Sequence, residues 1–331
     1  MENNLELKFN GKHTKVKQLA DFIQDNIIAR EMKVGDKLPS INFLSQRFSV
    51  SRDTVFKSLS DLRDRGVIDA IHGKNYFVSS PSRNVLLLLD DYSPFKEVLH
   101  NILVAELPKS YKIDLWFHQY NKQLFNNIIN ESIGQYNKYL VMNYDNEELS
   151  DSLTKIDKKK LLLLDFGKFV KDGYSYVCQD FDDGLYNALA TIKKDLIKYE
   201  KLIFVLNKNH KHPQSSKTAF SNFCLDNDLY FNIYNEILDD TPIKENCFYL
   251  VVKQEDVVKI VKKGKQNNLK PGKNYGLLAY NENPFFEVIE NGISSIGIDW
   301  QQMGKVASEF ILKSKPVKKY LPTVINKRNS F

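Results

Sequence analysis

The sequence predicts an α/β protein in which a small helical domain precedes a larger part built on two parallel sheets. Apolar residues recur at helical spacing up to Gly66, whereas strand-sized apolar runs alternate with amphipathic helices from Asn84 onward. Continuous apolar strands separated by helices favour parallel sheets that are covered on both faces. The second part has roughly 250 residues, more than one ordinary doubly wound sheet needs, so we expect two lobes.

The composition of the 331 residues is that of a globular protein, with 42% hydrophobic and 27% charged residues. No stretch approaches the ~20 apolar residues of a membrane-spanning helix, and the first residues lack the apolar core of a signal peptide. Cys178, Cys224 and Cys247 are widely spaced and form no metal or redox pattern. We therefore expect buried free thiols in a cytoplasmic protein that does not contact a membrane.

The positive charge is concentrated towards the N-terminus. The net charge is +6; residues 1–80 carry 13 Lys and Arg against 10 Asp and Glu, and the remaining residues carry 34 against 31. The same excess on far fewer residues makes the N-terminal part the more basic, which is compatible with nucleic-acid binding. The charge alone favours an ordinary solvated surface over nucleic-acid binding, so it does not decide the function.

The N-terminal part is predicted to begin with two helices. Apolar residues at helical spacing indicate a first helix from about Thr14 to Glu31. Gly35 and Pro39 then interrupt the pattern, and Ser40 is a suitable N-cap for a short second helix.

A third helix and a hairpin complete this part. Ser51 can cap a helix that ends at Gly66, and Val55, Leu59 and Leu62 form its apolar stripe. The strand-like runs "VIDAI" and "NYFVSS" then flank the turn "HGK". Three helices followed by a two-stranded ribbon is the order of a winged helix-turn-helix.

The stretch "GDKLPS…LSQRFSVSRDTV…L…LRDRGVIDAIHGKNYFV" resembles the DNA-binding domain of the GntR family of bacterial regulators, over Val16 to Val78. In such a unit the recognition helix presents its N-terminal residues to base edges in the major groove. Arg52 is then placed for guanine or phosphate, and Ser51 and Thr54 for phosphates. The resemblance also implies a wing tip at "HGK" that contacts the minor groove or the backbone.

The sequence departs from the family pattern at three positions. Asn42 and Phe56 stand where the family usually has Arg, and Asn75 replaces the second Gly of the wing. Lys57 and Arg47 are the nearby cations that could compensate. Phe56 either packs against the first helix or the wing, or contacts a thymine methyl group. The residues expected at DNA are Ser40, Asn42, Ser51, Arg52, Thr54, Phe56, Lys57, His72, Gly73 and Lys74.

The C-terminal part follows a short polar linker. We expect the winged domain to span residues 1–79, the linker 80–84 and the two-lobed domain 85–331. Helices are expected at 121–133 and 185–197, among others. Strands are predicted near 84–89, 112–118, 139–143, 160–165, 175–179, 201–206, 247–252 and 275–279.

Seven of the expected strands end in polar loops, such as "DDYSPF", "DFG" and "YNENP". Ligands of open α/β sheets bind beyond the carboxyl ends of strands, and carboxylates, amides and aromatic rings suit a polyol. This part resembles the ligand-binding core of LacI-type regulators, itself similar to periplasmic sugar-binding proteins. The resemblance is best in "YVCQDFDDGLYNAL" and "YNENPFFEVIENGISSIGIDWQQMG". It implies a two-lobed α/β/α effector domain that resembles periplasmic binding proteins.

The same resemblance implies contacts to the ligand. Asn143 and Asp165 end strands where the family binds its inducer, and Trp300 matches an aromatic residue that stacks on the ligand. Core burial of Trp300 and a solvated Lys253 are the alternatives. Asp90 and Asp91 either bind hydroxyl groups or only end their strand. The residues expected at the ligand are Asp91, Tyr92, Phe95, Asn143, Asp165, Lys217, Lys253, Asn281 and Trp300.

These features together predict a DNA-binding transcription regulator, a repressor of carbohydrate-utilisation genes that a small sugar controls from between the lobes. We expect a homodimer on a pseudo-palindromic double-stranded operator. No Walker loop, HExxH or GxSxG motif is present, and "QDFDD" does not have the spacing of a calcium loop. The chain is therefore not expected to be an enzyme or to use a metal or cofactor. The alternatives are a C-terminal domain that only dimerises or that senses a non-sugar metabolite.

Overall fold

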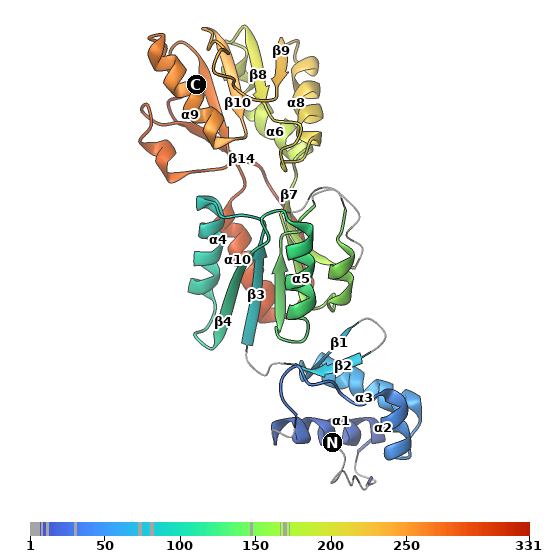
Figure 1. The fold of residues 1–331 in the computed structure, drawn as a ribbon. Helices are drawn as coiled ribbons and strands as arrows, with labels where there is room; N and C mark the ends of the chain where they lie inside the picture. Colours follow the sequence, from blue (N-terminus) through green and yellow to red (C-terminus); the bar gives the residue numbers. More distant parts are fainter. Residues whose placement is uncertain are drawn as a thin grey trace.

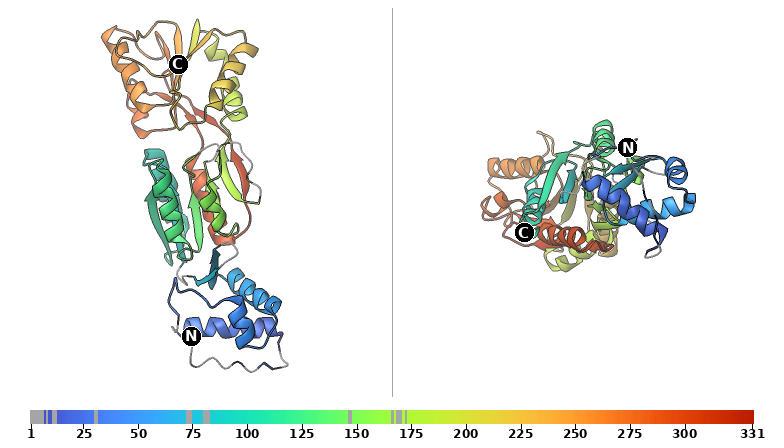
Figure 2. Two further views of the ribbon diagram at one scale, coloured as in Figure 1. Left: turned by 45° about the vertical axis from the view of Figure 1, so that its right-hand side comes forward. Right: turned by 90° about the horizontal axis from the view of Figure 1, so that it is seen from below.

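The computed structural model shows three bodies arranged end to end, an N-terminal domain, an N-lobe and a C-lobe (Figure 1). The two further views in Figure 2 show the same order. The structure describes residues 7, 9–10, 13–29, 32–71, 75–79, 83–145, 148–165, 167, 171 and 173–331.

The N-terminal domain contains the predicted three helices and hairpin. Thr14, Ser40 and Ser51 each cap a helix with a side-chain oxygen that accepts a backbone N–H. The two strands pair antiparallel, from Ile68 opposite Val78 onward. The predicted wing tip at residues 72–74 lies outside the described residues. The elements are α1 (Lys15–Ile28), α2 (Ile41–Arg47), α3 (Arg52–Asp64), β1 (Ile68–Ile71) and β2 (Asn75–Val78).

The predicted apolar stripe of α3 forms the centre of this domain. Val55, Leu59 and Leu62 are fully buried against Leu19 of α1. The opposite face of α3 is exposed, and it is polar apart from Phe56, which has 51% of its surface exposed. Burial of one face thus leaves the other face of α3 open to a partner.

The N-lobe is a six-stranded parallel sheet with helices on both faces, in the order β13-β7-β6-β5-β3-β4. Its central strands β5 and β6 are buried along their whole length because both faces of the sheet are covered. The strands are β3 (Arg83–Leu89), β4 (Tyr111–Phe117), β5 (Lys138–Val141), β6 (Leu161–Leu164), β7 (Ser175–Gln179) and β13 (Lys318–Leu321), and the helices are α4 (Pro94–Glu106), α5 (Lys122–Ser132), the 3₁₀ turn Asp151–Lys155 and α10 (Trp300–Lys313).

The C-lobe repeats this architecture, in the order β14-β12-β11-β10-β8-β9, with only β14 antiparallel. Cys178 of the N-lobe and Cys224 and Cys247 of the C-lobe are buried free thiols, as predicted. The C-lobe elements are α6 (Asp183–Thr191), α7 (Lys193–Leu196), β8 (Lys201–Val205), α8 (Ser215–Asp226), β9 (Phe231–Tyr234), β10 (Cys247–Val251), α9 (Gln254–Gln266), β11 (Gly276–Tyr280), the 3₁₀ turn Pro284–Glu287, β12 (Ser294–Gly297) and β14 (Val324–Asn326).

The chain passes between the lobes three times, after β7, after β12 and between β13 and β14. The second passage brings α10 back to pack beside α4 in the N-lobe. A hydrogen bond joins two of the passages, since Gln179 Nε2 donates to the hydroxyl of Thr323 at 3.3 Å. The same atom donates to the hydroxyl of Tyr280, at the end of β11, at 2.9 Å. The prediction of two parallel-sheet lobes is confirmed.

The four strands that were not predicted are β9, β12, β13 and β14. Strands β9, β13 and β14 lie at sheet edges and carry half-exposed or charged residues, so they lack a continuous apolar run. Strand β12 has the sequence "SSIG", and it is buried because it lies between β11 and β14 in the sheet. Tertiary pairing, which the local sequence does not show, creates these strands.

Gly304 of α10 permits the close packing of α10 on α4. A Cβ atom at this position would lie 2.7 Å from Cβ and Cγ2 of Ile102. We expect Gly304→Ala to lower the free energy of unfolding by about 1–3 kcal/mol through overpacking, although Ala favours the helix by about 1 kcal/mol. Urea unfolding of this variant and of Lys305→Ala, at an exposed position of the same helix, measures the effect. Equal stability of the two variants would contradict the account.

Candidate functional site

The N-terminal end of α3 presents the first candidate site. Arg52 is exposed at the first helical position. The hydroxyl of Ser51 accepts the backbone N–H of Thr54 at 3.1 Å and lies 2.8 Å from the Thr54 hydroxyl. Both short side chains therefore complete the helix cap, and their hydroxyls lie beside Arg52. Lys57 forms an exposed ion pair with Asp53 at 2.7 Å on the same helix.

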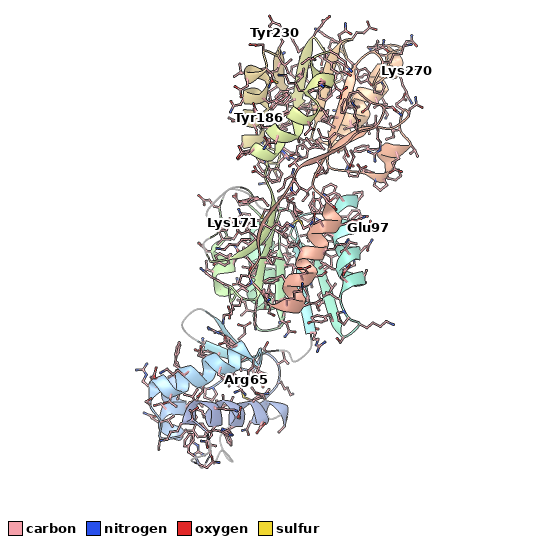
Figure 3. All side chains as sticks on the ribbon, turned by 180° about the vertical axis from the view of Figure 1, so that it is seen from behind. Arg65, Glu97, Lys171, Tyr186, Tyr230 and Lys270 are labelled. Atoms are coloured by element: carbon pink, nitrogen blue, oxygen red, sulfur yellow. The ribbon has the colours of Figure 1, made fainter. Side chains whose placement is uncertain are left out.

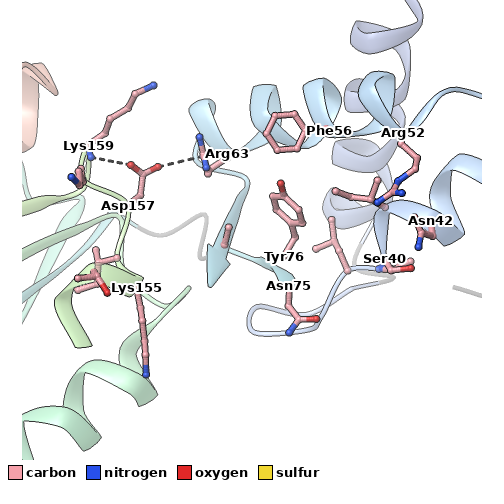
Figure 4. Close-up of a pocket in the computed structure, with 17 residues that line it drawn as sticks. Ser40, Asn42, Arg52, Phe56, Arg63, Asn75, Tyr76, Lys155, Asp157 and Lys159 are labelled. Carbon is pink, nitrogen blue, oxygen red and sulfur yellow. Dashed lines mark hydrogen bonds and ion pairs between the residues drawn. The ribbon is translucent and has the colours of Figure 1, made fainter. Parts of the chain in front are cut away.

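The exposed face of α3 borders a cavity of about 750 Å³ between the N-terminal domain and the N-lobe (Figure 4). Four of the residues predicted at DNA line it, namely Ser40, Asn42, Arg52 and Phe56. Tyr76 of β2 lines it too and was not singled out from the sequence. Packing does not bury Phe56, which disfavours a purely structural role for this ring. Ser51, Thr54 and Lys57 do not line the cavity, and His72, Gly73 and Lys74 lie outside the described residues.

A second cavity, of about 290 Å³, lies between the two lobes at the carboxyl ends of their strands. Its N-lobe wall is acidic and its C-lobe wall carries basic side chains. The N-lobe contributes Asp90, Asp91, Tyr92, Phe95, Lys96, Tyr120, Asp165 and Gln179, and the C-lobe contributes His210, Lys211, His212, Lys253, Tyr280 and Asn281, among others.

An ionic cluster organises the N-lobe wall. The buried ammonium of Lys96 contacts the carboxylates of Asp90 and Asp91, and the hydroxyl of Tyr120 donates to Asp90 at 2.6 Å. Burial lowers the pKa of Lys96, but the two carboxylates outweigh it and raise that pKa overall. The cluster holds Asp90 and Asp91 in place beside the cavity.

Asp165 is an acid of the cavity whose pKa is strongly raised. Burial, and then the negative charge of Asp90, raise its pKa to about 7. Its Oδ1 atom is buried and accepts no hydrogen bond from the described residues. A donor from a ligand would offset the cost of this desolvation.

Asn281 presents a matching acceptor from the opposite lobe. Its Oδ1 atom is also buried without a hydrogen-bond partner among the described residues. Asp165 and Asn281 both have left-handed backbone conformations, with φ of 44° and 64°, directly after β6 and β11. Asp165 and Asn281 line the cavity from the two lobes, and each has a buried oxygen without a hydrogen-bond partner among the described residues. A ligand with several hydroxyl groups could supply the missing donors.

The structure does not bring three of the predicted ligand residues to this cavity. Asn143 is buried and holds the following loop, since its Nδ2 atom donates to the carbonyls of Asp145 and Glu148. Lys217 lies on α8, outside the lining residues. Trp300 is 5% exposed and packs in the N-lobe core, 5.0 Å from Phe95 between ring centroids. Trp300 therefore has the core position given above as its alternative, because the helix α10 that it starts returns into the core.

The other six predicted ligand residues, Asp91, Tyr92, Phe95, Asp165, Lys253 and Asn281, all line the cavity. Sequence reasoning missed Lys96, Tyr120 and the His210–His212 loop. The ring of His212 is buried against that of Tyr280, and burial lowers its pKa to about 3. Its position after the predicted strand 201–206 was a usable signal, because every other lining segment also follows a strand.

Comparison with known proteins identifies the N-terminal domain. Residues 15–78 match the family described as "Bacterial regulatory proteins, gntR family". The repressor MngR of the mannosyl-D-glycerate transport and metabolism system of Escherichia coli K12 is 35% identical over 68 residues, which are 20% of this chain and 28% of MngR. The chain spans less than half the length of the first three curated relatives that it matches.

Solved structures match the two lobes. The trehalose repressor from Escherichia coli has a TM-score of 0.59 at 10% identity, over 74% of this chain and all of the repressor chain. A LacI family regulator from Lactobacillus casei with bound glucose has a TM-score of 0.58 at 12% identity, over 75% and 100%. The chain thus joins a GntR-type DNA-binding domain to the fold of LacI-type effector domains, as predicted.

The matched family and relatives are transcription regulators, in agreement with the prediction of a regulator and not of an enzyme. Among the described residues, no helix is long and apolar enough to span a membrane. The same residues contain no cluster of His, Cys, Asp and Glu that could hold a metal ion.

The raised pKa of Asp165 makes a testable contribution to stability. Between its ordinary value of 3.8 and about 7, the folded chain keeps a proton that the unfolded chain releases, so this group lowers stability as the pH rises through that window. Asp165→Asn removes this contribution. We expect the variant to gain stability relative to the wild type between pH 4.5 and pH 8 in urea unfolding. Parallel pH profiles would contradict the assignment, and Asp228→Asn on the exposed C-lobe surface is the control.

Proposed function

We propose that this chain is a sequence-specific transcription regulator, a repressor of carbohydrate-utilisation genes, whose DNA binding is controlled by a small sugar between the lobes. The observation that carries the proposal is the cavity between the lobes, with its unpaired acceptors from Asp165 and Asn281. A GntR-type domain on the same chain supplies the DNA-binding function.

The lining residues support a polyhydroxyl ligand. Hydroxyl groups would donate to Asp165 and Asn281, and Asp91 adds a carboxylate at the rim of the same wall. The rings of Phe95 and Tyr92 offer apolar surface to the C–H face of a sugar. Bridging of the two lobes by one ligand would favour a closed arrangement, because only that arrangement satisfies both acceptors.

The C-lobe wall favours a variant of this ligand. Lys211 and Lys253 both line the cavity, opposite the acidic wall. A sugar acid or a phosphorylated sugar would place hydroxyl groups on the N-lobe and its anionic group beside the lysines. The ligand tests should therefore include charged and neutral sugars.

The DNA partner follows from the N-terminal domain. We propose that Arg52 reads guanine or contacts phosphate, and that Phe56, where relatives place Arg, contributes an apolar contact to a thymine methyl group. The regulator acts as a cytoplasmic homodimer, with residues 1–79 of each copy on one half-site of a pseudo-palindromic operator and residues 85–331 as the effector part. The relatives named as repressors support the direction of regulation.

A thermal-shift panel tests the ligand. Neutral monosaccharides, sugar phosphates and uronic acids are added to the full chain, and a ligand at 100 times its Kd should stabilise it by about 2.7 kcal/mol. Asn281→Ala should reduce the shift because one acceptor is lost, whereas Lys217→Ala, outside the cavity, should leave it intact. No shift with any sugar would favour a domain that only dimerises or that binds another metabolite.

The role of Arg52 is tested by DNA affinity. Arg52→Ala should cost about 1–3 kcal/mol of specific binding to a duplex that the wild-type chain selects from a random library. Lys270→Ala, at the far end of the C-lobe (Figure 3), is the control for lost charge. Equal affinity of Arg52→Ala and the wild type would remove Arg52 from the recognition surface.

A further inference from the structure

The base of the wing docks on the N-lobe through a buried ion pair. Lys160 precedes β6 of the N-lobe, and its Nζ atom lies 2.9 Å from Oδ2 of Asp69 in β1. The two side chains are only 9% and 3% exposed. The docked surface is the edge of the N-lobe sheet where its parallel strands begin.

Two outer ion pairs surround this contact. Arg63 lies 3.4 Å from Asp157, and Lys159 lies 3.0 Å from Asp64. The second of these pairs is largely exposed, with 71% and 51% of the side chains accessible, so it contributes little energy. The outer pairs nevertheless place opposite charges in register on the two surfaces. Figure 4 shows the pair of Arg63 and Asp157.

A lysine within the N-lobe anchors the surface on which the N-terminal domain docks. Lys138, at the start of β5, donates from Nζ to the carbonyl of Lys159 at 2.8 Å. Burial, and then the charge of Lys160, lower the pKa of Lys138 to about 8. From the N-lobe, Lys160 contacts Asp69. Lys138 thus anchors, from within the N-lobe, the segment that carries Lys159 and Lys160.

A buried ion pair selects one arrangement. A docking of the wing that kept both groups buried but apart would leave Lys160 and Asp69 without a partner, which is strongly unfavourable. Ion pairs of this kind add less to net stability than to the choice of a single geometry. The contact therefore suits a role in orientation.

The same contact is connected to the interlobe cavity by one short strand. Lys160 directly precedes β6, and Asp165 directly follows it. All four residues of β6 are fully buried. The wing contact and the unpaired carboxylate of the cavity lie at opposite ends of this strand.

We propose that Lys160 and Asp69 are positioning residues, which hold the N-terminal domain on the N-lobe in one orientation and so set the separation of the two recognition helices in a dimer. This inference rests on the proposed DNA-binding function. A fixed separation makes the second half-site contact effectively intramolecular, which raises affinity for a two-half-site operator without any new contact to DNA. Binding to a single half-site gains nothing from it.

The test compares two duplexes on the full chain. One is the two-half-site duplex that the wild-type chain selects from a random library, and the other keeps only one half-site. Lys160→Met and Asp69→Lys should each lower the ratio of the two affinities about ten-fold or more, with half-site affinity retained. The double variant Lys160→Asp with Asp69→Lys should restore most of the ratio. Lys159→Met, in the exposed pair of the same loop, is the matched control and should change the ratio less than two-fold.

Each outcome decides the matter. An unchanged ratio of the two affinities in Lys160→Met would overturn the inference, whether both affinities stay the same or fall equally. Lys160 lies outside the DNA-binding domain, so this variant separates the positioning of that domain from its contacts to DNA. Failure of the double variant to recover the ratio while it still binds the half-site would also overturn the inference. If the wild-type chain selected no duplex, the proposed function itself would fail, which is a distinct result.

Discussion

Parallel strand pairing in the N-lobe is the constraint on which the other features depend. Because β3, β4, β5, β6 and β7 run in one direction, all their amino ends lie at one edge of the sheet and all their carboxyl ends at the other. The amino edge meets the N-terminal domain through Lys160, and the carboxyl edge presents Asp165 to the C-lobe. One sheet thereby separates the edge that meets the N-terminal domain from the edge that lines the interlobe cavity.

The removal of charged groups from water has different consequences at the two edges of the N-lobe sheet. At the carboxyl edge the acids outnumber Lys96, the charge of Asp90 opposes ionisation of Asp165, and the Oδ1 atom of Asp165 remains unpaired among the described residues. At the amino edge the buried charges of Lys160 and Asp69 are paired with each other. The first edge would gain from the proposed ligand, whereas the second is already satisfied and favours one geometry. For a ligand to control DNA binding, it is enough that closure of the lobes alters how the N-terminal domain docks at the amino edge.

The sequence predicts this organisation where local chemistry decides it. The caps at Ser40 and Ser51 and the apolar stripe of α3 locate the N-terminal domain, and polar residues after apolar strands locate Asp165 and Asn281. Tertiary packing decides the rest. Trp300 follows a strand like the cavity residues, but α10 turns it into the core. The pairing of Lys160 with Asp69 joins residues 91 positions apart, and no local pattern announces it.

The central claim is that a ligand in the interlobe cavity changes DNA affinity. The most direct measurement is the affinity of the full chain for its selected two-half-site duplex, with and without the sugar that stabilises the protein in the thermal-shift panel. The account predicts a change of about 5- to 150-fold, and the same change must appear in sugar affinity when DNA is added. An identical DNA affinity at saturating sugar would contradict it.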